Sequence, residues 1–306
     1  MDSSIQGTVI RNLIAHFSSD NLIGKKVKNG ELRKQLVKLE TRWRCPEGMH
    51  VTEIEMEHFS MEFLEADEPN REYAILQLHG GGYVSGLRNA YRTFAAVYLE
   101  SCDNISVLTP DYRVAPEHIF PAALEDALEA FEWLIKKGFQ EEKIILCGDS
   151  AGGGLALSLC LLLKQRGRKL PSGMIVMSPW TDLLQSGESY VLNFNNDPLF
   201  GKTKDSLIYN RDYVGENDPK NPYISPLYGN LKGFPPMLIQ VGSYEMLLSD
   251  SIGIARKAQK AGVNVKLSIY EGMFHEFQMA LSMIPESKKA WDEVEAFIHE
   301  RMKKTE

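Results

Sequence analysis

From residue 74 onward, short apolar runs alternate with segments whose apolar residues recur at helical spacing. The runs predict buried strands, because parallel strands covered on both faces are apolar throughout. These strands are expected at 74–78, 105–109, 144–147, 174–177, 237–241 and 265–270. Helices are expected at 121–137, 155–163, 248–261 and 286–302. Such alternation predicts an α/β protein with a mostly parallel, doubly wound sheet.

Three segments depart from this alternation. Residues 5–39 look helical and amphipathic, with an interruption at Asn29-Gly30. Residues 51–64 alternate polar and apolar side chains, which is typical of a pair of antiparallel strands at a sheet edge. From about 181 to 236 the period fails, and short helices are expected within it, for example at 202–213. A long irregular insertion with aromatic residues in an α/β domain is typical of a lid.

Composition and charge exclude several classes of function. The net charge of -7 over 306 residues disfavours nucleic-acid binding. No apolar stretch reaches the length that spans a membrane, and the first residues lack the features of a signal peptide. The four cysteines have no metal-like spacing. We therefore expect a reduced, cytoplasmic protein without a membrane or nucleic-acid partner.

The sequence Gly148-Asp149-Ser150-Ala151-Gly152 lies between the predicted strand 144–147 and the predicted helix 155–163. In a strand–turn–helix of this kind the serine occupies a strained turn, and its hydroxyl is exposed above the sheet edge. The flanking glycines are needed because a Cβ there would collide with the adjacent strand or helix. The start of the helix also directs free N–H groups toward Ser150. The motif therefore predicts a nucleophile beside part of an anion-stabilising site.

A second glycine-rich motif, His79-Gly80-Gly81-Gly82, follows the predicted strand 74–78. Consecutive glycines leave backbone N–H groups open to close approach by a ligand. A flexible loop is the alternative, but such loops seldom follow a buried strand so abruptly. We interpret the tract as an oxyanion hole. Asp111 and Arg113 are expected to pair and to hold the loop below it.

A serine nucleophile needs a base, and histidine has the suitable pKa. Of the seven histidines, His79 begins the glycine tract, and His275 lies in a loop just past a predicted strand, where parallel sheets place their sites. The acid that orients the base should follow the preceding strand, which indicates Glu245. Asp250 is the alternative. It stands where the next helix begins, so helix N-capping explains it well.

Four motifs of the chain match one known family. They are His79-Gly80-Gly81-Gly82, Asp111-Tyr112-Arg113-Val114-Ala115-Pro116-Glu117, Gly148-Asp149-Ser150-Ala151-Gly152-Gly153 and Gly272-Met273-Phe274-His275. With them, the chain resembles the hormone-sensitive-lipase-like branch of the α/β-hydrolases, the bacterial esterase type, over roughly residues 70–300. The resemblance implies the α/β-hydrolase fold, with a mainly parallel eight-stranded sheet flanked by helices under a helical cap.

The resemblance also implies a domain organisation. Helices within 1–45 would contribute to the cap, and 46–180 would form the first part of the hydrolase core. Residues 181–236 would be the cap insertion, and 237–306 the second part of the core.

The implied site is a triad of Ser150, Glu245 and His275. Its oxyanion donors would be the N–H groups of Gly81, Gly82 and Ala151, with His79, Gly80 and Asp149 as supporting motif residues. The sequence departs from the family at the acid, because Glu245-Met246-Leu247 stands where many members carry Asp-Pro-Leu. This departure keeps Asp250 as an alternative.

The implied activity is that of a serine carboxylesterase, which forms an acyl-enzyme and needs no metal or cofactor. Aromatic residues of the insertion would wall the acyl pocket, and a walled pocket favours short- to medium-chain esters. The aromatic residues are Trp180, Phe194, Phe200, Tyr209 and Tyr213. An amidase, a lactonase or a thioesterase would use the same apparatus. A ligand-binding receptor is a further alternative, but receptors on this fold lack the histidine that this chain retains. The expected partner is a small-molecule ester, and a homodimer stays open.

Overall fold

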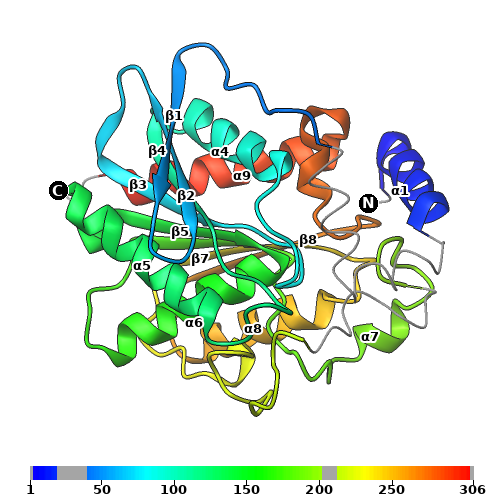
Figure 1. The fold of residues 1–306 in the computed structure, drawn as a ribbon. Coiled ribbons are helices and arrows are strands. Elements are labelled where there is room, and N and C mark those ends of the chain that lie inside the picture. The colour runs from blue at the N-terminus through cyan, green and yellow to red at the C-terminus, as the bar shows by residue number, and fades with distance from the viewer. Residues whose placement is uncertain (1–2, 19–39, 202–211, 304–306) are drawn as a thin grey trace.

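The computed structural model describes residues 3–18, 40–201 and 212–303, and its core is one sheet flanked by helices (Figure 1). The strands are β1 Met49–Glu55, β2 Ser60–Ala66, β3 Asn70–Leu78, β4 Ile105–Asp111, β5 Ile144–Asp149, β6 Gly173–Met177, β7 Met237–Gly242 and β8 Val265–Tyr270. Their order in the sheet is β1-β2-β4-β3-β5-β6-β7-β8. The pairs from β4 to β8 are parallel, whereas β1–β2 and β2–β4 are antiparallel.

Every residue of the central strands β5, β6 and β7 is buried. Helices cover both faces of the sheet there, so these strands have no solvent-facing side chains and are apolar almost throughout. The predicted doubly wound sheet and the antiparallel pair at its edge are confirmed.

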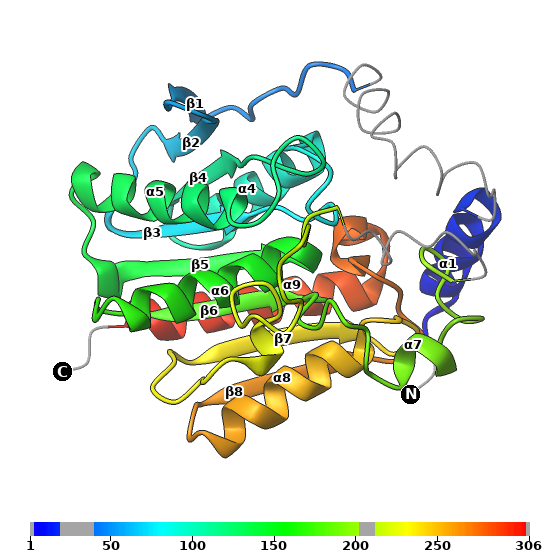
Figure 2. The same ribbon diagram turned by 60° about the horizontal axis from the view of Figure 1, so that its bottom comes forward.

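The helices form two layers (Figure 2). Helices α4 and α9 pack on one face of the sheet, and α5, α6 and α8 pack on the other. Their bounds are α4 Asn89–Ser101, α5 Ala122–Lys137, α6 Ser150–Gln165, α8 Leu248–Lys260 and α9 Pro285–Met302. The short 3₁₀ helices are η1 Glu141–Lys143, η3 Pro226–Tyr228 and η4 Phe277–Met283.

Helix α4 is absent from the predicted elements, although its sequence carries the signal. Tyr91, Phe94 and Tyr98 are buried along one face, at the spacing of three to four residues that an amphipathic helix requires. Phe94 and Tyr98 contact Trp291 of α9, with ring centroids 5.0 and 5.1 Å from that of the tryptophan. These contacts join α4 and α9 into one layer.

Two further helices lie on the side toward which the parallel strands point, α1 Ile5–Ser18 and α7 Ser189–Leu192 (Figures 1 and 2). Arg11 of α1 donates a 2.7 Å hydrogen bond to the carbonyl oxygen of Gly272, in the loop after β8. Ser189 Oγ of α7 donates to the carbonyl oxygen of Met246, in the loop after β7. Both helices thus contact loops at the carboxyl edge of the sheet. The domain boundaries at 45, 180 and 236 remain a prediction.

Parts of two sequence predictions lie outside the described residues. The helical interpretation of 5–39 can be compared with the structure only up to Ser18, the last residue of α1. The helix expected within 202–213 falls outside the described residues except for its last two positions.

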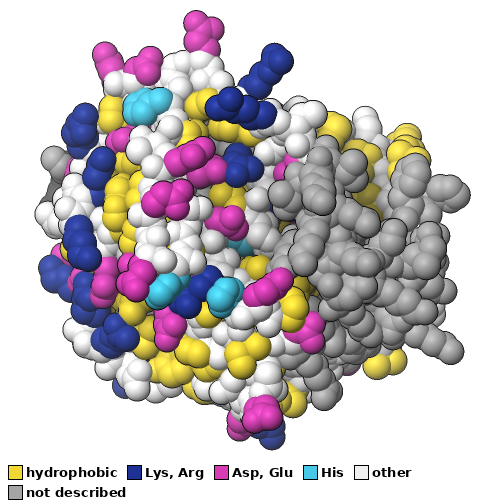
Figure 3. Space-filling model, in the orientation of Figure 1, with side chains coloured by type: hydrophobic (Ala, Val, Ile, Leu, Met, Phe, Trp, Pro, Cys, Tyr) yellow, Lys and Arg dark blue, Asp and Glu magenta, His cyan; other side chains and the backbone are white. Residues whose placement is uncertain are grey.

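Acidic and basic side chains are interspersed over the face shown in Figure 3. Several of them form ion pairs, such as Arg92 with Glu62 at 2.6 Å and Arg88 with Glu40 at 2.7 Å. In the described part of the chain, no helix combines the length and the apolar character that a membrane span needs.

The N-capping role expected for Asp250 is wrong. Helix α8 begins at Leu248, and its N-cap residue Leu247 makes no side-chain capping bond. Asp250 lies within the first turn and is only 1% exposed. Its Oδ1 accepts hydrogen bonds from the backbone N–H groups of Thr181 (2.8 Å) and Asp182 (2.7 Å). Asp250 therefore anchors the chain after β6 to α8. The position of Asp250 in the sequence, close to the start of a helix, gives no indication of this contact.

We expect Asp250→Ala to lower the free energy of unfolding by about 2–4 kcal/mol, because two buried N–H groups lose their acceptor. Asp250→Asn keeps an oxygen acceptor and should lose much less. Burial raises the pKa of Asp250 from 3.8 to about 7, so folding favours the protonated form. The wild-type protein should therefore lose stability as pH rises between these values, and Asp250→Asn should lose less, because its side chain does not ionise. Urea unfolding across this pH range measures both effects, and wild-type stability in Asp250→Ala would contradict the anchoring role.

Candidate active site

Ser150 stands at the junction of β5 and α6, in a backbone conformation that non-glycine residues rarely adopt. Its φ is +50°, in the left-handed region. A Cβ on Gly152 would collide with the carbonyl oxygen of Leu78, and one on Gly148 with that of Gly152. The carbonyl oxygen of Ser150 accepts a 2.8 Å hydrogen bond from the N–H of Trp180. The turn thus has the strained geometry that exposes a nucleophile above a sheet edge.

The glycine tract emerges beside this turn, because β3 pairs with β5 and Leu78 lies opposite Gly148. Gly81 and Gly82 have positive φ angles of +111° and +65°. Among the described residues, neither of their N–H groups donates to a protein acceptor. Ala151 belongs to the first turn of α6, where N–H groups have no intrahelical acceptor. The predicted oxyanion donors therefore all have N–H groups available at the carboxyl edge of the sheet.

His79 supports the glycine tract from below. Its ring is fully buried and stacks on Tyr112, with centroids 4.1 Å apart and planes 6° apart. Its Nδ1 lies 2.8 Å from the carbonyl oxygen of Gly80, and Tyr112 donates a 2.6 Å hydrogen bond to the carbonyl oxygen of His79. Burial lowers the pKa of His79. A neutral ring with Nδ1 as donor fits these contacts and fixes the start of the tract.

The expected pair of Asp111 and Arg113 does not form. Arg113 instead pairs with Asp126 of α5, which is only 1% exposed and also accepts the backbone N–H of Arg113 at 2.7 Å. The buried carboxylate accepts several hydrogen bonds from Arg113 at once, which favours Asp126 as the partner of the guanidinium. Asp111 accepts the N–H of Leu87 at 2.7 Å, so it still holds the loop after the tract.

Glu245 and His275 come together at the ends of β7 and β8. His275 Nδ1 lies 2.8 Å from Glu245 Oε2, and both side chains are buried. The other carboxylate oxygen, Oε1, accepts the N–H of Gly242 at 2.6 Å and the hydroxyl of Ser178 at 2.7 Å. These three contacts fix the carboxylate and hold Nδ1 as a donor, which leaves Nε2 to exchange a proton.

The electrostatics of this pair favour the imidazolium. Burial opposes the positive charge of His275. The hydrogen bond to Glu245 and the charges of Glu276, Glu245 and Asp197 outweigh it and raise the pKa of His275 to about 9. Burial also raises the pKa of Glu245, against the hydrogen bonds of His275, Gly242 and Ser178.

The structure does not bring all three predicted triad residues into contact. Among the described residues, no hydrogen bond joins Ser150 to His275. The carboxylate oxygen Oε1 of Glu276 lies 3.7 Å from His275 Nε2, and the ring of Phe200 packs on the imidazole at a centroid distance of 4.7 Å. In ligand-free sites the nucleophile–base hydrogen bond is often long and tightens only when substrate binds.

The insertion contributes residues that the sequence reasoning missed. The side-chain amide of Asn193 donates to the carbonyl oxygens of Ser243 (2.9 Å) and Glu245 (2.8 Å). Asp197 Oδ2 accepts the N–H of Met246 at 2.8 Å. These bonds hold the loop that carries Glu245. No periodicity marks such contacts, because both residues lie in a segment without regular structure.

Of the five aromatic residues expected in the insertion, Trp180, Phe200 and Tyr213 are buried. Tyr213 stacks on Tyr83, just after the glycine tract, at a centroid distance of 3.8 Å. Phe194 is partly buried against the core, and Tyr209 lies outside the described residues.

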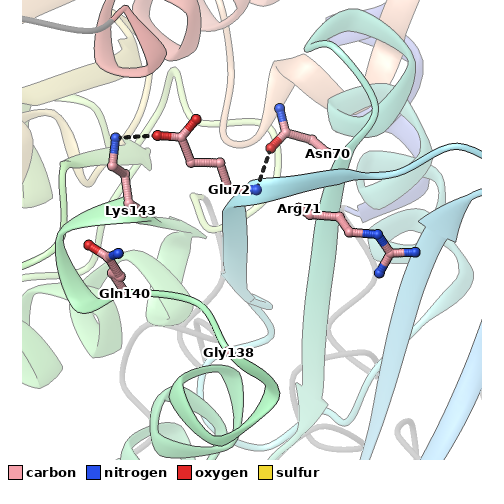
Figure 4. A pocket seen from close by; sticks show the side chains of 6 residues that line it. All are labelled: Asn70, Arg71, Glu72, Gly138, Gln140 and Lys143. Carbon is pink, nitrogen blue, oxygen red and sulfur yellow. Dashed lines mark hydrogen bonds and ion pairs between the residues drawn. The ribbon is translucent and has the colours of Figure 1, made fainter.

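A polar pocket at the opposite end of the sheet carries no comparable arrangement (Figure 4). It is formed by the start of β3 and the segment between α5 and β5, and its residues are Asn70, Arg71, Glu72, Gly138, Gln140 and Lys143. Lys143 Nζ pairs with Glu72 at 2.7 Å. The described residues contain no cluster of three or more histidine, cysteine or acidic side chains suited to a metal ion.

The sheet order, the strained serine turn and the histidine–carboxylate pair together define an α/β-hydrolase. A model of the alpha/beta hydrolase fold family matches residues 75–279. The chain belongs to this family, within its hormone-sensitive-lipase-like branch.

Relatives and solved structures agree with this assignment. An esterase of Acinetobacter venetianus is 37% identical over 223 residues, which cover 73% of each chain. An acetyl-hydrolase of Streptomyces hygroscopicus is 36% identical over 224 residues, covering 73% of this chain and 74% of the relative. The crystal structure of an esterase from the bacterial hormone-sensitive lipase family superposes with a TM-score of 0.86 at 30% identity, covering 99% of this chain and 100% of the other.

The buried pair gives a direct prediction for the ionisation of His275. Glu245→Gln removes the negative charge but keeps a similar volume, so the pKa of His275 should fall from about 9 by about one pH unit or more. Titration of the imidazole signals by NMR measures this change. Glu271→Gln, an exposed carboxylate in the loop after β8, is the matched control. An unmoved titration in Glu245→Gln would mean that Glu245 does not set the charge of His275.

Proposed function

We propose that the protein is a serine carboxylesterase that hydrolyses short- to medium-chain esters through an acyl-enzyme intermediate. The observation that carries this proposal is the buried 2.8 Å contact between His275 and Glu245 at the sheet edge from which Ser150 also emerges. The names of the relatives support the same class, since they include an esterase, an acetyl-hydrolase and an ethyl acetate hydrolase of Pseudomonas putida.

In the proposed reaction His275 Nε2 takes the proton of Ser150, and the serine oxygen attacks the ester carbonyl carbon. Glu245 orients the imidazole through Nδ1 and stabilises its charged form. His275 then protonates the leaving alcohol and later activates water to hydrolyse the acyl-enzyme.

The N–H groups of Gly81, Gly82 and Ala151 would bind the oxyanion. Loss of one such donor typically costs about 3 kcal/mol of transition-state stabilisation. Because these donors belong to the backbone, their role is supported by the positive φ angles of the two glycines and by the position of Ala151 in the first turn of α6.

Ser150→Ala should abolish ester hydrolysis, because no other group can form the acyl-enzyme. Thermal unfolding should remain close to wild type, since the change removes one hydroxyl group at a turn. Hydrolysis of an activated short-chain ester, followed together with a thermal melt, tests both expectations. Normal turnover in the variant would rule out Ser150 as the nucleophile.

The acid can be tested in the same assay. Glu245→Ala should lose far more activity than Asp250→Asn, because Asp250 bonds to backbone N–H groups and makes no contact with His275 among the described residues. The opposite ranking would transfer the role of the acid to Asp250.

Substrate size should be limited by the aromatic residues of the insertion. Phe200 packs on His275, and the backbone N–H of Trp180 donates a hydrogen bond to the carbonyl oxygen of Ser150. We expect kcat/KM to be highest for short- to medium-chain esters and low for emulsified long-chain triglycerides. Phe200→Ala should shift the preference toward longer acyl chains. A nitrophenyl ester series from acetyl to palmitoyl measures this, and a wild-type preference for palmitoyl would contradict it.

Amidase, lactonase and thioesterase activities would use the same residues. Measuring kcat/KM for amide, lactone and thioester substrates beside the ester series ranks these activities. A receptor without turnover is disfavoured by the intact His275–Glu245 pair. We also propose a cytoplasmic location, supported by four free cysteines. A homodimer stays a prediction that gel filtration can check.

A further inference from the structure

Three oxygen atoms from different parts of the chain converge on Gly80. A Cβ at this glycine would overlap Asp149 Oδ2 and would lie 2.6 Å from Glu276 Oε1 and 2.9 Å from the hydroxyl of Tyr91. Asp149 precedes Ser150, and Glu276 follows His275. Two carboxyl groups thus meet directly below the glycine tract, each adjacent in sequence to a residue of the proposed triad.

The backbone directs Glu276 into this position. Its φ is +54°, a left-handed conformation that costs energy for a residue with a side chain. Its side chain is 14% exposed, and Oε1 lies 3.7 Å from His275 Nε2. The strained residue therefore places a carboxyl oxygen near the nitrogen that must exchange a proton with Ser150.

Asp149 is 3% exposed, and its Oδ2 has no well-formed hydrogen bond among the described residues. A buried carboxyl group that lies next to a second carboxyl oxygen is in an environment that favours its protonated form. Burial, together with the charge and hydrogen bond of Glu276, raises the pKa of Asp149 well above its ordinary value, while Tyr91 and the N–H of Gly80 oppose this.

We propose that Asp149 and Glu276 share one proton, and that Glu276, kept ionised by the neutral Asp149, is a positioning residue that pairs with protonated His275 through Nε2. The inference rests on the proposed function, because it concerns the base of that reaction. It gives the imidazolium a carboxylate on each side, with Glu245 at Nδ1 and Glu276 at Nε2.

The consequence is a resting form and an active form. In the resting form the proton on Nε2 is held toward Glu276, and His275 cannot accept the proton of Ser150. Loss of that proton as pH rises frees Nε2 for the serine. Glu276 thereby sets the pH at which hydrolysis begins and moves it above the ordinary titration of histidine.

Other charged and titratable groups also surround this site, but none of them is a second carboxylate beside Nε2 of His275 among the described residues. Asp197 and Glu245 face His275 from the loops after α7 and β7. Tyr91 faces the pair from α4, and Tyr112 and His79 face it from the chain just after β4 and β3; burial favours the neutral form of each. Asp111 and Arg92 act on His79 with opposite signs.

The test compares isosteric variants in a Ser150→Ala background, in which the imidazole of His275 is titrated by NMR. Glu276→Gln removes the charge near Nε2, so the pKa of His275 should fall by about one pH unit or more. Asp149→Asn imitates the protonated acid and keeps a donor for Glu276, so the titration should stay close to that of the background protein. Glu271→Gln, in the same loop but exposed, is the control for a general loss of negative charge.

Kinetics of the same variants with an intact Ser150 give the second readout. The acid limb of kcat/KM should move to lower pH in Glu276→Gln. If the limb moves by about one pH unit, the rate of this variant at pH 7, relative to its own plateau, should rise about tenfold. Asp149→Asn should keep the wild-type acid limb, whatever its plateau.

The possible outcomes separate the two proposals. An unmoved titration in Glu276→Gln would overturn the inference even if the wild-type enzyme hydrolyses esters normally. A changed titration in Asp149→Asn with none in Glu276→Gln would overturn it as well, because the charge would then belong to Asp149. Absence of ester hydrolysis by the wild-type protein would refute the proposed function, while the NMR titration would still test the proton sharing.

Discussion

Burial of the Glu245 carboxylate beside His275 is the interaction on which the rest of the site depends. A buried charge is tolerated only when it is paired and hydrogen-bonded. Glu245 meets this requirement with a partner on each side, since His275 binds Oε2 while Gly242 and Ser178 bind Oε1. These donors come from β7, from the chain after β6 and from the loop after β8. The ends of three neighbouring strands must therefore stay in register for the pair to exist, so the proposed chemistry requires an intact sheet.

The sheet and most of its helices can be predicted because local sequence determines them. Central strands such as β5 and β7 are buried on both faces, so their sequences are short continuous apolar runs. The glycines at 148 and 152 indicate a sharp turn, and the structure shows the collisions that any larger residue would suffer there. Helix α4 is an exception. Its buried residues Tyr91, Phe94 and Tyr98 have helical spacing, so the sequence carries the signal, but the helix is absent from the predicted elements.

Contacts between distant segments cannot be predicted in the same way. The position of Asp250 indicates a helix cap, whereas its bonds to Thr181 and Asp182 depend on how the insertion leaves the sheet. Arg113 pairs with Asp126, a buried acid on a helix, rather than with the nearby Asp111. The approach of Glu276 to Asp149 depends on one left-handed backbone angle, which no pattern of residue types encodes. The role of Glu245 as the acid remains a prediction, although its contact with His275 fits it.

The bonds from Asn193 and Asp197 to the loop after β7 have a consequence for inactivation by heat. Segments between the strands typically open at lower free-energy cost than the central strands. If residues 189–197 detach first, the loop that carries Glu245 loses three hydrogen bonds from the two side chains while the sheet is still intact. The protein would then pass through a folded but inert state on warming, so the temperature at which activity disappears is set by how firmly residues 189–197 are attached rather than by the stability of the sheet.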